Sequence, residues 1–146
     1  SEKRFDYTVL GDPVNLASRL EGQSGAYGFQ RILGQETVNA LKSESTLFEL
    51  DLIQVKGKTE PVKIFTSFNN FSLTDEKLAE FQKDHKEFLE NYRNQQWDSA
   101  LTFVEKWEEQ VVEFDLYYAI FKDRIKDMKL HLTDPDWNGA YVATTK

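Results

Sequence analysis

The segment Arg4–Glu21, RFDYTVLGDPVNLASRLE, constrains the fold more than any other stretch, because a strand, a glycine and a helix follow one another within it. Phe5–Leu10 is rich in aromatic and β-branched residues, which predicts a strand. Gly11 then allows the backbone to bend. Asp12 suits the N-cap of a helix and Pro13 suits its first position. The chain is therefore expected to turn directly from a sheet into a helix.

The predicted helix carries two polar side chains on one face. Asn15 and Arg19 are four residues apart, so they are stacked on successive turns. A guanidinium group matches the geometry of phosphoryl oxygens, and an amide adds a further donor and an acceptor. Such a pair can bind a polyphosphate. On spacing alone, it is also a common kind of solvated helix face.

At these residues the chain resembles the catalytic domain of class III nucleotidyl cyclases, where a strand leads through Gly-Asp-x-Val-Asn into a helix with Asn-x-x-x-Arg. The resemblance implies that Asn15 orients the ribose and that Arg19 stabilises the transition state at the α-phosphate. Thr8 falls where the family reads the base, although it also suits an ordinary strand. Adenylate cyclases place Asp or Thr there, and a hydroxyl both donates and accepts. ATP is the expected substrate, and GTP is the alternative.

A second stretch resembles the closing hairpin of the same family. Leu50–Phe65 reads LDLIQVKGKTEPVKIF, which predicts two strands joined by a tight turn at Lys56-Gly57-Lys58. The resemblance implies that Lys56 contacts the β- and γ-phosphates, and Lys58 is a further candidate. Lysines also protect exposed sheet edges without binding a ligand. The occurrence of both motifs in the family's order favours phosphate contact for Lys56.

The resemblance covers residues 1–69, since Tyr27-Gly28 and Ile32–Leu41 also follow the family's order. Family members bind two Mg²⁺ ions through aspartates on strands that precede this region, and an upstream lysine helps to read adenine. No metal ligand is therefore assigned within this chain. We expect this chain to be the C-terminal part of a cyclase, and we expect the isolated chain to be inactive. Because the family's sites form between two paired domains, the resemblance also implies a homodimer.

Composition narrows the range of partners. The net charge of −7 disfavours nucleic acid and direct contact with an anionic membrane. The chain has no cysteine, so a disulfide framework is excluded and a reducing compartment is permitted. The sequence has no long apolar run. A cytoplasmic location is expected, with any membrane anchor supplied by other parts of the cyclase.

The sequence changes character near Asn69, and residues 70–146 predict a small helical region with about three helices. Thr74 or Asp75 can cap the first helix. A turn at residues 94–96 separates it from a second helix marked by Trp97, Ala100, Leu101, Val104 and Trp107, and a third is expected over Phe114–Leu132. Apolar and aromatic residues recur at helical spacing on the first and third helices and predict their core faces: Leu78, Phe81, His85, Phe88, Leu89, Tyr92, Leu116, Tyr117, Ile120, Phe121, Ile125 and Met128.

The predicted fold class is α+β, with part of a ferredoxin-like cyclase sheet followed by this helical region. Tyr92 and Trp97–Leu101 resemble a tetratricopeptide helix pair, which needs a neighbour to bury its faces. Trp137 and Tyr141 resemble the tails of bacterial cyclases and are expected to pack onto a protein surface. Two alternatives to a catalytic role remain open: a helical interaction or dimerisation module, and a nucleotide-binding cyclase relative without activity.

Overall fold

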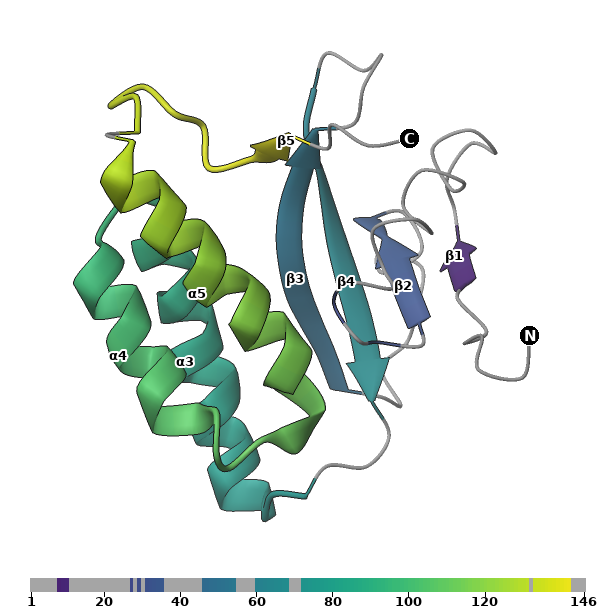
Figure 1. Cartoon of the computed structure of the whole chain (residues 1–146). Coiled ribbons are helices and arrows are strands. Elements are labelled where there is room, and N and C mark those ends of the chain that lie inside the picture. Colours follow the sequence, from purple (N-terminus) through teal and green to yellow (C-terminus); the bar gives the residue numbers. More distant parts are fainter. Residues whose placement is uncertain are drawn as a thin grey trace. The chain divides into compact units, whose positions relative to one another are not determined.

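The computed structural model describes residues 8–10, 27, 29, 31–35, 46–54, 60–68, 72–131 and 133–142. The chain divides into two compact units, one of residues 1–69 with 140–146 and one of residues 70–139. The first unit contains a mixed β-sheet, and the second is helical (Figure 1). The predicted α+β class is therefore confirmed, and the sheet is consistent with part of a ferredoxin-like fold.

Within the described residues, the sheet of the first unit has five strands in the order β1-β2-β4-β3-β5. Strand β1 is parallel to β2, and β5 is parallel to β3, whereas β4 is antiparallel to both β2 and β3. The two strands of the predicted hairpin are confirmed as β3 and β4, and their turn lies outside the described residues. The strand bounds are β1 Thr8–Leu10, β2 Arg31–Gly34, β3 Thr46–Gln54, β4 Val62–Phe68 and β5 Tyr141–Val142.

Strand β3 contains a β-bulge. Its register with β4 shifts between Glu49 and Asp51, so Leu50 is the extra residue. Buried and half-buried side chains alternate as far as Leu50, and burial then resumes at Asp51 instead of Leu52. Because side chains on a strand alternate between its two faces, the bulge shifts this alternation by one residue. The carboxylate of Asp51 therefore points to the buried face.

The strands of the first unit bury a compact set of apolar side chains. Fully burying one such side chain stabilises a fold by about 1.5–3 kcal/mol. The buried members on the strands are Ile32, Leu33, Phe48, Leu50, Ile53, Ile64 and Phe65.

In its described residues, the second unit contains three α-helices and one short 3₁₀ helix. The first helix begins as predicted: the hydroxyl of Thr74 accepts a hydrogen bond from the backbone N–H of Lys77 at 3.2 Å. Asp75 and Glu76 in the first turn suit the positive end of the helix dipole. The three predicted helices are confirmed, with bounds α3 Asp75–Arg93, α4 Trp97–Trp107, η1 Val112–Phe114 and α5 Asp115–Leu130.

Aromatic rings form the core of the helical unit. The ring centroid of Phe81 lies 5.1 Å from that of Trp107 and 5.1 Å from that of Phe114. Tyr92 and Phe121 are 4.7 Å apart in an edge-to-face arrangement, a geometry that stabilises aromatic pairs. The predicted core face of α3 is confirmed apart from Leu78, which is only half-buried; the buried residues are Phe81, Asp84, His85, Phe88, Leu89 and Tyr92.

The prediction that Leu116 belongs to the core is wrong. Its side chain is 57% exposed. The buried residues of α5 are Tyr117, Tyr118, Phe121 and Ile125, which form a stripe about one quarter of the helix wide. At about 100° per residue, Leu116 lies roughly opposite the middle of this stripe. Apolar spacing alone did not distinguish the two sides of the first turn.

The loop after α5 returns to the turn between α3 and α4. The side-chain amide of Gln95 donates a hydrogen bond to the backbone oxygen of Asp134 at 2.7 Å. The ring of Trp137 lies 5.5 Å from Tyr92 and 6.0 Å from Trp97, measured between centroids. Trp137 therefore packs on the helical unit of this chain.

Gly139, at the end of this loop, is expected to be sensitive to substitution. Its φ is +88°, and a Cβ built there would lie 2.8 Å from Cγ of Arg93. An L-residue in the left-handed region costs roughly 1–2 kcal/mol before any clash. Gly139→Ala should therefore lower the free energy of unfolding of the helical unit by about 1–3 kcal/mol, measured by urea titration. Asp136→Ala, an exposed change in the same loop, is the control and should change it by less than about 0.5 kcal/mol.

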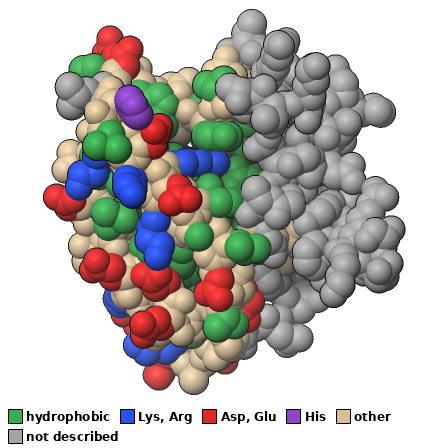
Figure 2. Space-filling view, in the orientation of Figure 1, with side chains coloured by type: hydrophobic (Ala, Val, Ile, Leu, Met, Phe, Trp, Pro, Cys, Tyr) green, Lys and Arg blue, Asp and Glu red, His purple; other side chains and the backbone are tan. Residues whose placement is uncertain are grey.

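Acidic and basic side chains lie interspersed over the visible face of the helical unit (Figure 2). Two ion pairs link α5 to the α4 region: Lys122 to Glu108, the C-cap residue of α4, at 2.8 Å, and Lys129 to Asp98 of α4 at 3.0 Å. Exposed pairs of this kind contribute about 0–1 kcal/mol each. Among the described residues, no helix combines the length and the apolar character needed to cross a membrane.

Candidate functional site

Of the predicted nucleotide-site residues, the structure describes only Thr8, and only its backbone. Thr8 is the first residue of β1, where it pairs with Arg31 of β2. This confirms the predicted strand over its last three residues, in front of the predicted glycine bend. The other predicted site residues lie outside the described part of the chain, and their roles stay predictions: Asn15, Arg19, Lys56 and Lys58.

The strands that precede the two predicted motifs in the sequence end at the same end of the sheet. Strand β1 is parallel to β2, and both β2 and β3 are antiparallel to β4, so β1 and β3 run in the same direction. Their C-terminal ends therefore lie at the same end of the sheet (Figure 1). The glycine of the first motif follows Leu10 directly, and Lys56 follows Gln54 by two residues. The last described residues before each motif, Leu10 and Gln54, are therefore the C-terminal residues of two strands that run in the same direction.

A buried polar pair lies in the same unit. The hydroxyl of Tyr27 donates a hydrogen bond to Oδ2 of Asp51 at 2.5 Å, and the backbone N–H of Leu52 donates to Oδ1 at 2.9 Å. Tyr27 and Asp51 are each 1% exposed. A buried carboxylate is costly unless it is hydrogen-bonded, so this geometry is a structural requirement of the bulged strand.

This pair was not predicted from the sequence. Asp51 interrupts an otherwise apolar run, LDLI, and a charged residue inside such a run is the signal that indicates a buried hydrogen-bonding partner. Without the bulge, the two-residue period places Asp51 beside Glu49 on the half-exposed face. The identity of its partner required the fold, because Tyr27 lies 24 residues away in the sequence.

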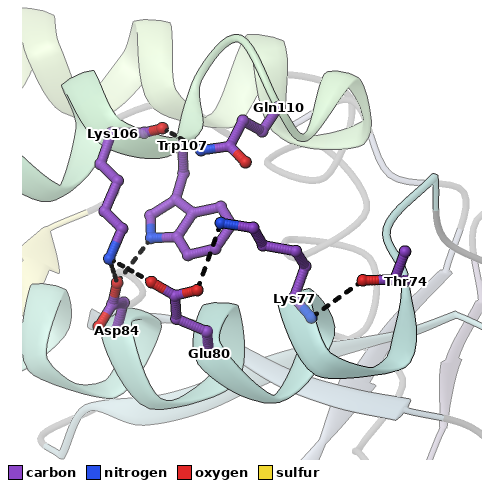
Figure 3. A network of polar contacts seen from close by, with 7 residues as sticks. All are labelled: Thr74, Lys77, Glu80, Asp84, Lys106, Trp107 and Gln110. Carbon is purple, nitrogen blue, oxygen red and sulfur yellow. Dashed lines mark hydrogen bonds and ion pairs between the residues drawn. The ribbon is translucent and has the colours of Figure 1, made fainter.

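A second polar network joins α3 to α4 in the helical unit (Figure 3). Oδ2 of Asp84 accepts hydrogen bonds from Nε1 of Trp107 at 2.9 Å and from Nζ of Lys106 at 2.7 Å. The same Nζ lies 2.6 Å from Oε2 of Glu80. Lys77 adds a weaker contact to Glu80 at 3.5 Å. Asp84, which is only 8% exposed, thus has both an ammonium and an indole donor.

The charges in this network indicate a structural role. Burial alone raises the pKa of Asp84, but the hydrogen bonds from Lys106 and Trp107 outweigh it, and the pKa lies below its ordinary value of 3.8. The hydrogen bond from Lys106 also lowers the pKa of Glu80, and the bond to Asp84 raises the pKa of Lys106. All three groups are therefore charged at neutral pH. A general acid or base needs a pKa near the working pH, so the network is a link between helices.

The network predicts an acid-sensitive helical unit. Because the pKa values of Asp84 and Glu80 are lowered in the fold, their stabilising contribution is fully present above the unfolded-state values of about 4–4.5 and is lost as pH falls below them. Urea titrations at pH 7 and pH 3 should show lower stability at pH 3, and Asp84→Asn should reduce that difference. An equal pH dependence in the variant contradicts this account.

Side chains that can bind a metal ion are not clustered in the described residues. In that part of the chain, no group of three or more His, Cys, Asp or Glu side chains could hold a metal ion. His85 lies among the aromatic rings of the core, with Phe114 at 5.7 Å between centroids. His131 lies on the exposed end of α5, with Nδ1 3.1 Å from a carboxylate oxygen of Asp127.

Three adenylate cyclases are similar to part of this chain. The adenylate cyclase of Anabaena cylindrica is 41% identical over 66 residues, which are 42% of this chain and 13% of that protein. The terminal-differentiation-specific adenylate cyclase of Dictyostelium discoideum is 38% identical over 68 residues, 44% of this chain and 3% of that protein. Adenylate cyclase 1 of Rhizobium meliloti (strain 1021) is 32% identical over 65 residues, 44% of this chain and 10% of that protein.

These similarities support a relationship between the chain and adenylate cyclases. Each match spans less than half of this chain and at most 13% of the relative's length. No family profile matches the chain. No solved structure matches it either. The relationship therefore rests on partial sequence similarity. The fold and the polar pairs described above are observed in this chain and are not inferred from a relative.

Proposed function

We propose that this chain is the C-terminal part of a class III adenylate cyclase, called the parent cyclase below, which converts ATP to 3′,5′-cyclic AMP and pyrophosphate. Residues 1–69 would complete the catalytic domain, residues 70–139 would form a helical unit that follows it, and strand β5 would return to the sheet. The observation that carries the proposal is the ordered pair of motifs at Asn15/Arg19 and Lys56, together with partial similarity to three adenylate cyclases. The common direction of β1 and β3 supports it, since both motifs follow strands that end at one end of the sheet.

Each proposed site residue has a separate task. Thr8 would hydrogen-bond the base, with ATP as the substrate and GTP as the alternative. Asn15 would orient the ribose so that its 3′-oxygen can attack the α-phosphorus, which forms the cyclic ester and breaks the bond to pyrophosphate. Arg19 would meet the negative charge that grows on the α-phosphate in the transition state. Lys56, with Lys58 as a further candidate, would bind the β- and γ-phosphates.

In this proposal, the remaining components of the site would come from other parts of the parent cyclase. Two Mg²⁺ ions, which would activate the attacking hydroxyl and balance the leaving phosphates, would bind to residues that precede the chain in the parent cyclase. Within the described residues there is no cluster that fits such an ion. In the proposal, two copies pair in the cytoplasm as a homodimer, so that each site receives its metal ligands from one copy and the nucleotide-binding residues from the other.

Cyclic AMP formation tests the proposal. The parent cyclase is incubated with Mg²⁺ and either ATP or GTP, and the cyclic product is measured; the isolated 146-residue chain is assayed in parallel. We expect cyclic AMP from the parent with ATP, and no product from the isolated chain. Cyclic GTP from the parent identifies the alternative substrate. Cyclic AMP from the isolated chain contradicts the proposed location of the metal site, and a parent without any cyclase activity contradicts the proposed function.

A second function, an interaction module, is favoured by the charge distribution. Residues 70–139 contain 16 acidic and nine basic side chains, so the whole net charge of −7 lies in the helical unit. A surface of one net sign attracts partners of the opposite sign and repels like-charged ones. The helical unit would then bind a basic protein surface while the sheet unit remains close to neutral. Weakening of such a complex by salt is the discriminating measurement.

A further inference from the structure

From the buried contact between Tyr27 and Asp51, we infer that these two residues are a positioning pair, which fixes the two proposed phosphate-binding motifs relative to each other. The inference rests on the proposed function. Tyr27 follows Arg19 by eight residues, and Asp51 precedes Lys56 by five. The 2.5 Å hydrogen bond between them therefore joins the segment after the first motif to the strand that leads into the second.

The bulge in β3 is the local cause of this contact. It turns Asp51 to the buried face of the strand, where its two carboxylate oxygens accept separate hydrogen bonds. One bond comes from Tyr27 and the other from the neighbouring backbone N–H of Leu52. Bulges recur beside active sites, where they redirect a side chain. Here the redirected carboxylate holds its own strand and a distant segment in one arrangement.

The contact is suited to holding the two segments in place because the hydrogen bond is short and both residues are buried. In addition, both carboxylate oxygens of Asp51 accept hydrogen bonds. A hydrogen bond to a carboxylate is about twice as strong as one between neutral groups. Within a buried site, loss of one partner deprives the other of a hydrogen bond, which penalises alternative arrangements. A rotation of Tyr27 away from Asp51 would therefore be disfavoured. The proposed reaction depends mostly on alignment, so small displacements of either motif should slow it.

Tyr27→Phe in the parent cyclase tests this inference, since it removes one oxygen atom and keeps the ring. We expect kcat to fall about 10- to 100-fold, with a much smaller change in KM, because a displacement of about 1 Å can cost this much in rate. Tyr118→Phe is the matched control: Tyr118 is also buried, but it lies on α5 in the helical unit. It should leave kcat unchanged.

Two further variants identify the contact itself. Asp51→Asn retains an oxygen that can accept from Tyr27, so it should lose less activity than Asp51→Ala. The double variant Tyr27→Phe/Asp51→Ala should be no slower than the slower of its two single variants, because both remove the same interaction. Additive losses overturn the inference. All rates are measured well below the unfolding midpoint of each variant, which is recorded separately.

The outcomes separate this inference from the proposed function. If the wild-type parent makes cyclic AMP while Tyr27→Phe lowers only the unfolding midpoint and leaves kcat unchanged, the pair is purely structural and the inference is wrong. The proposed function then stands. If the wild-type parent makes no cyclic nucleotide, the proposed function itself fails.

Discussion

Arg19→Ala in the parent cyclase is expected to lower the rate of cyclic AMP formation about 100- to 1000-fold. In the proposed site, the guanidinium donates to oxygens of the α-phosphate whose negative charge increases only in the transition state. A donor of this kind stabilises the transition state more than the bound substrate, so its removal lowers kcat and leaves KM largely unchanged. Turnover and KM are measured with ATP in the wild type and the variant.

Lys83→Ala is the control for the loss of one positive charge, because Lys83 is exposed on α3. Its turnover should match the wild type. Arg19→Lys keeps the charge but loses the planar fork that binds two oxygens, so we expect a smaller loss than for alanine. Near-normal turnover in Arg19→Ala contradicts the assigned role. A rise in KM at constant kcat points instead to uniform binding of the triphosphate.

Trp107→Ala is expected to cause the largest loss of stability in the helical unit, about 3–5 kcal/mol. Trp107 is 1% exposed and packs against Phe81 in the aromatic core. The substitution removes this packing, leaves a cavity, and deprives Asp84 of the indole N–H. Losses of this size approach the whole stability of many small domains. Urea titration followed by far-UV circular dichroism measures the change for the helical unit.

Two variants resolve the contributions of packing and hydrogen bonding at this position. Trp107→Phe keeps an aromatic ring and removes the N–H, while Lys106 continues to donate to Asp84. Its cost should therefore be smaller, about 1–3 kcal/mol. Leu130→Ala is the control for a large apolar residue that is 71% exposed, and it should change stability by less than about 0.5 kcal/mol. If Trp107→Ala is no more destabilising than this control, the aromatic core does not hold the helices together.

The helices could be predicted from the sequence because several local signals agreed. Thr74 is an N-cap, apolar residues recur along α3 at helical spacing, and the turn after Arg93 carries polar residues. The core membership of Asp84 was missed, although it lies three residues after Phe81 on the same face. A carboxylate enters such a core only when donors reach it, and those donors come from the next helix, α4.

Several features of the sheet could not be predicted from local sequence, because they depend on residues that are distant in the sequence. The two strands of the hairpin follow from alternation and the glycine turn, but the bulge at Leu50 depends on pairing with β4. Strand β5 has only two residues, too few to show any period. The contact between Tyr27 and Asp51 depends on the bulge and on a segment distant in sequence. The proposed nucleotide site was recognised from motifs, and its side-chain geometry stays a prediction.

Strand β5 has a consequence for biosynthesis. It joins β3 at Ile53 and Gln54, on the side away from β4, although roughly 90 residues separate the two strands in the sequence. At 5–20 residues per second, the ribosome needs on the order of ten seconds to synthesise that interval. During this delay the nascent helical unit can fold from contacts that are local in sequence, while this flank of β3 waits for its last neighbour. Translational pauses after residue 54 should therefore prolong the exposure of that flank to chaperones.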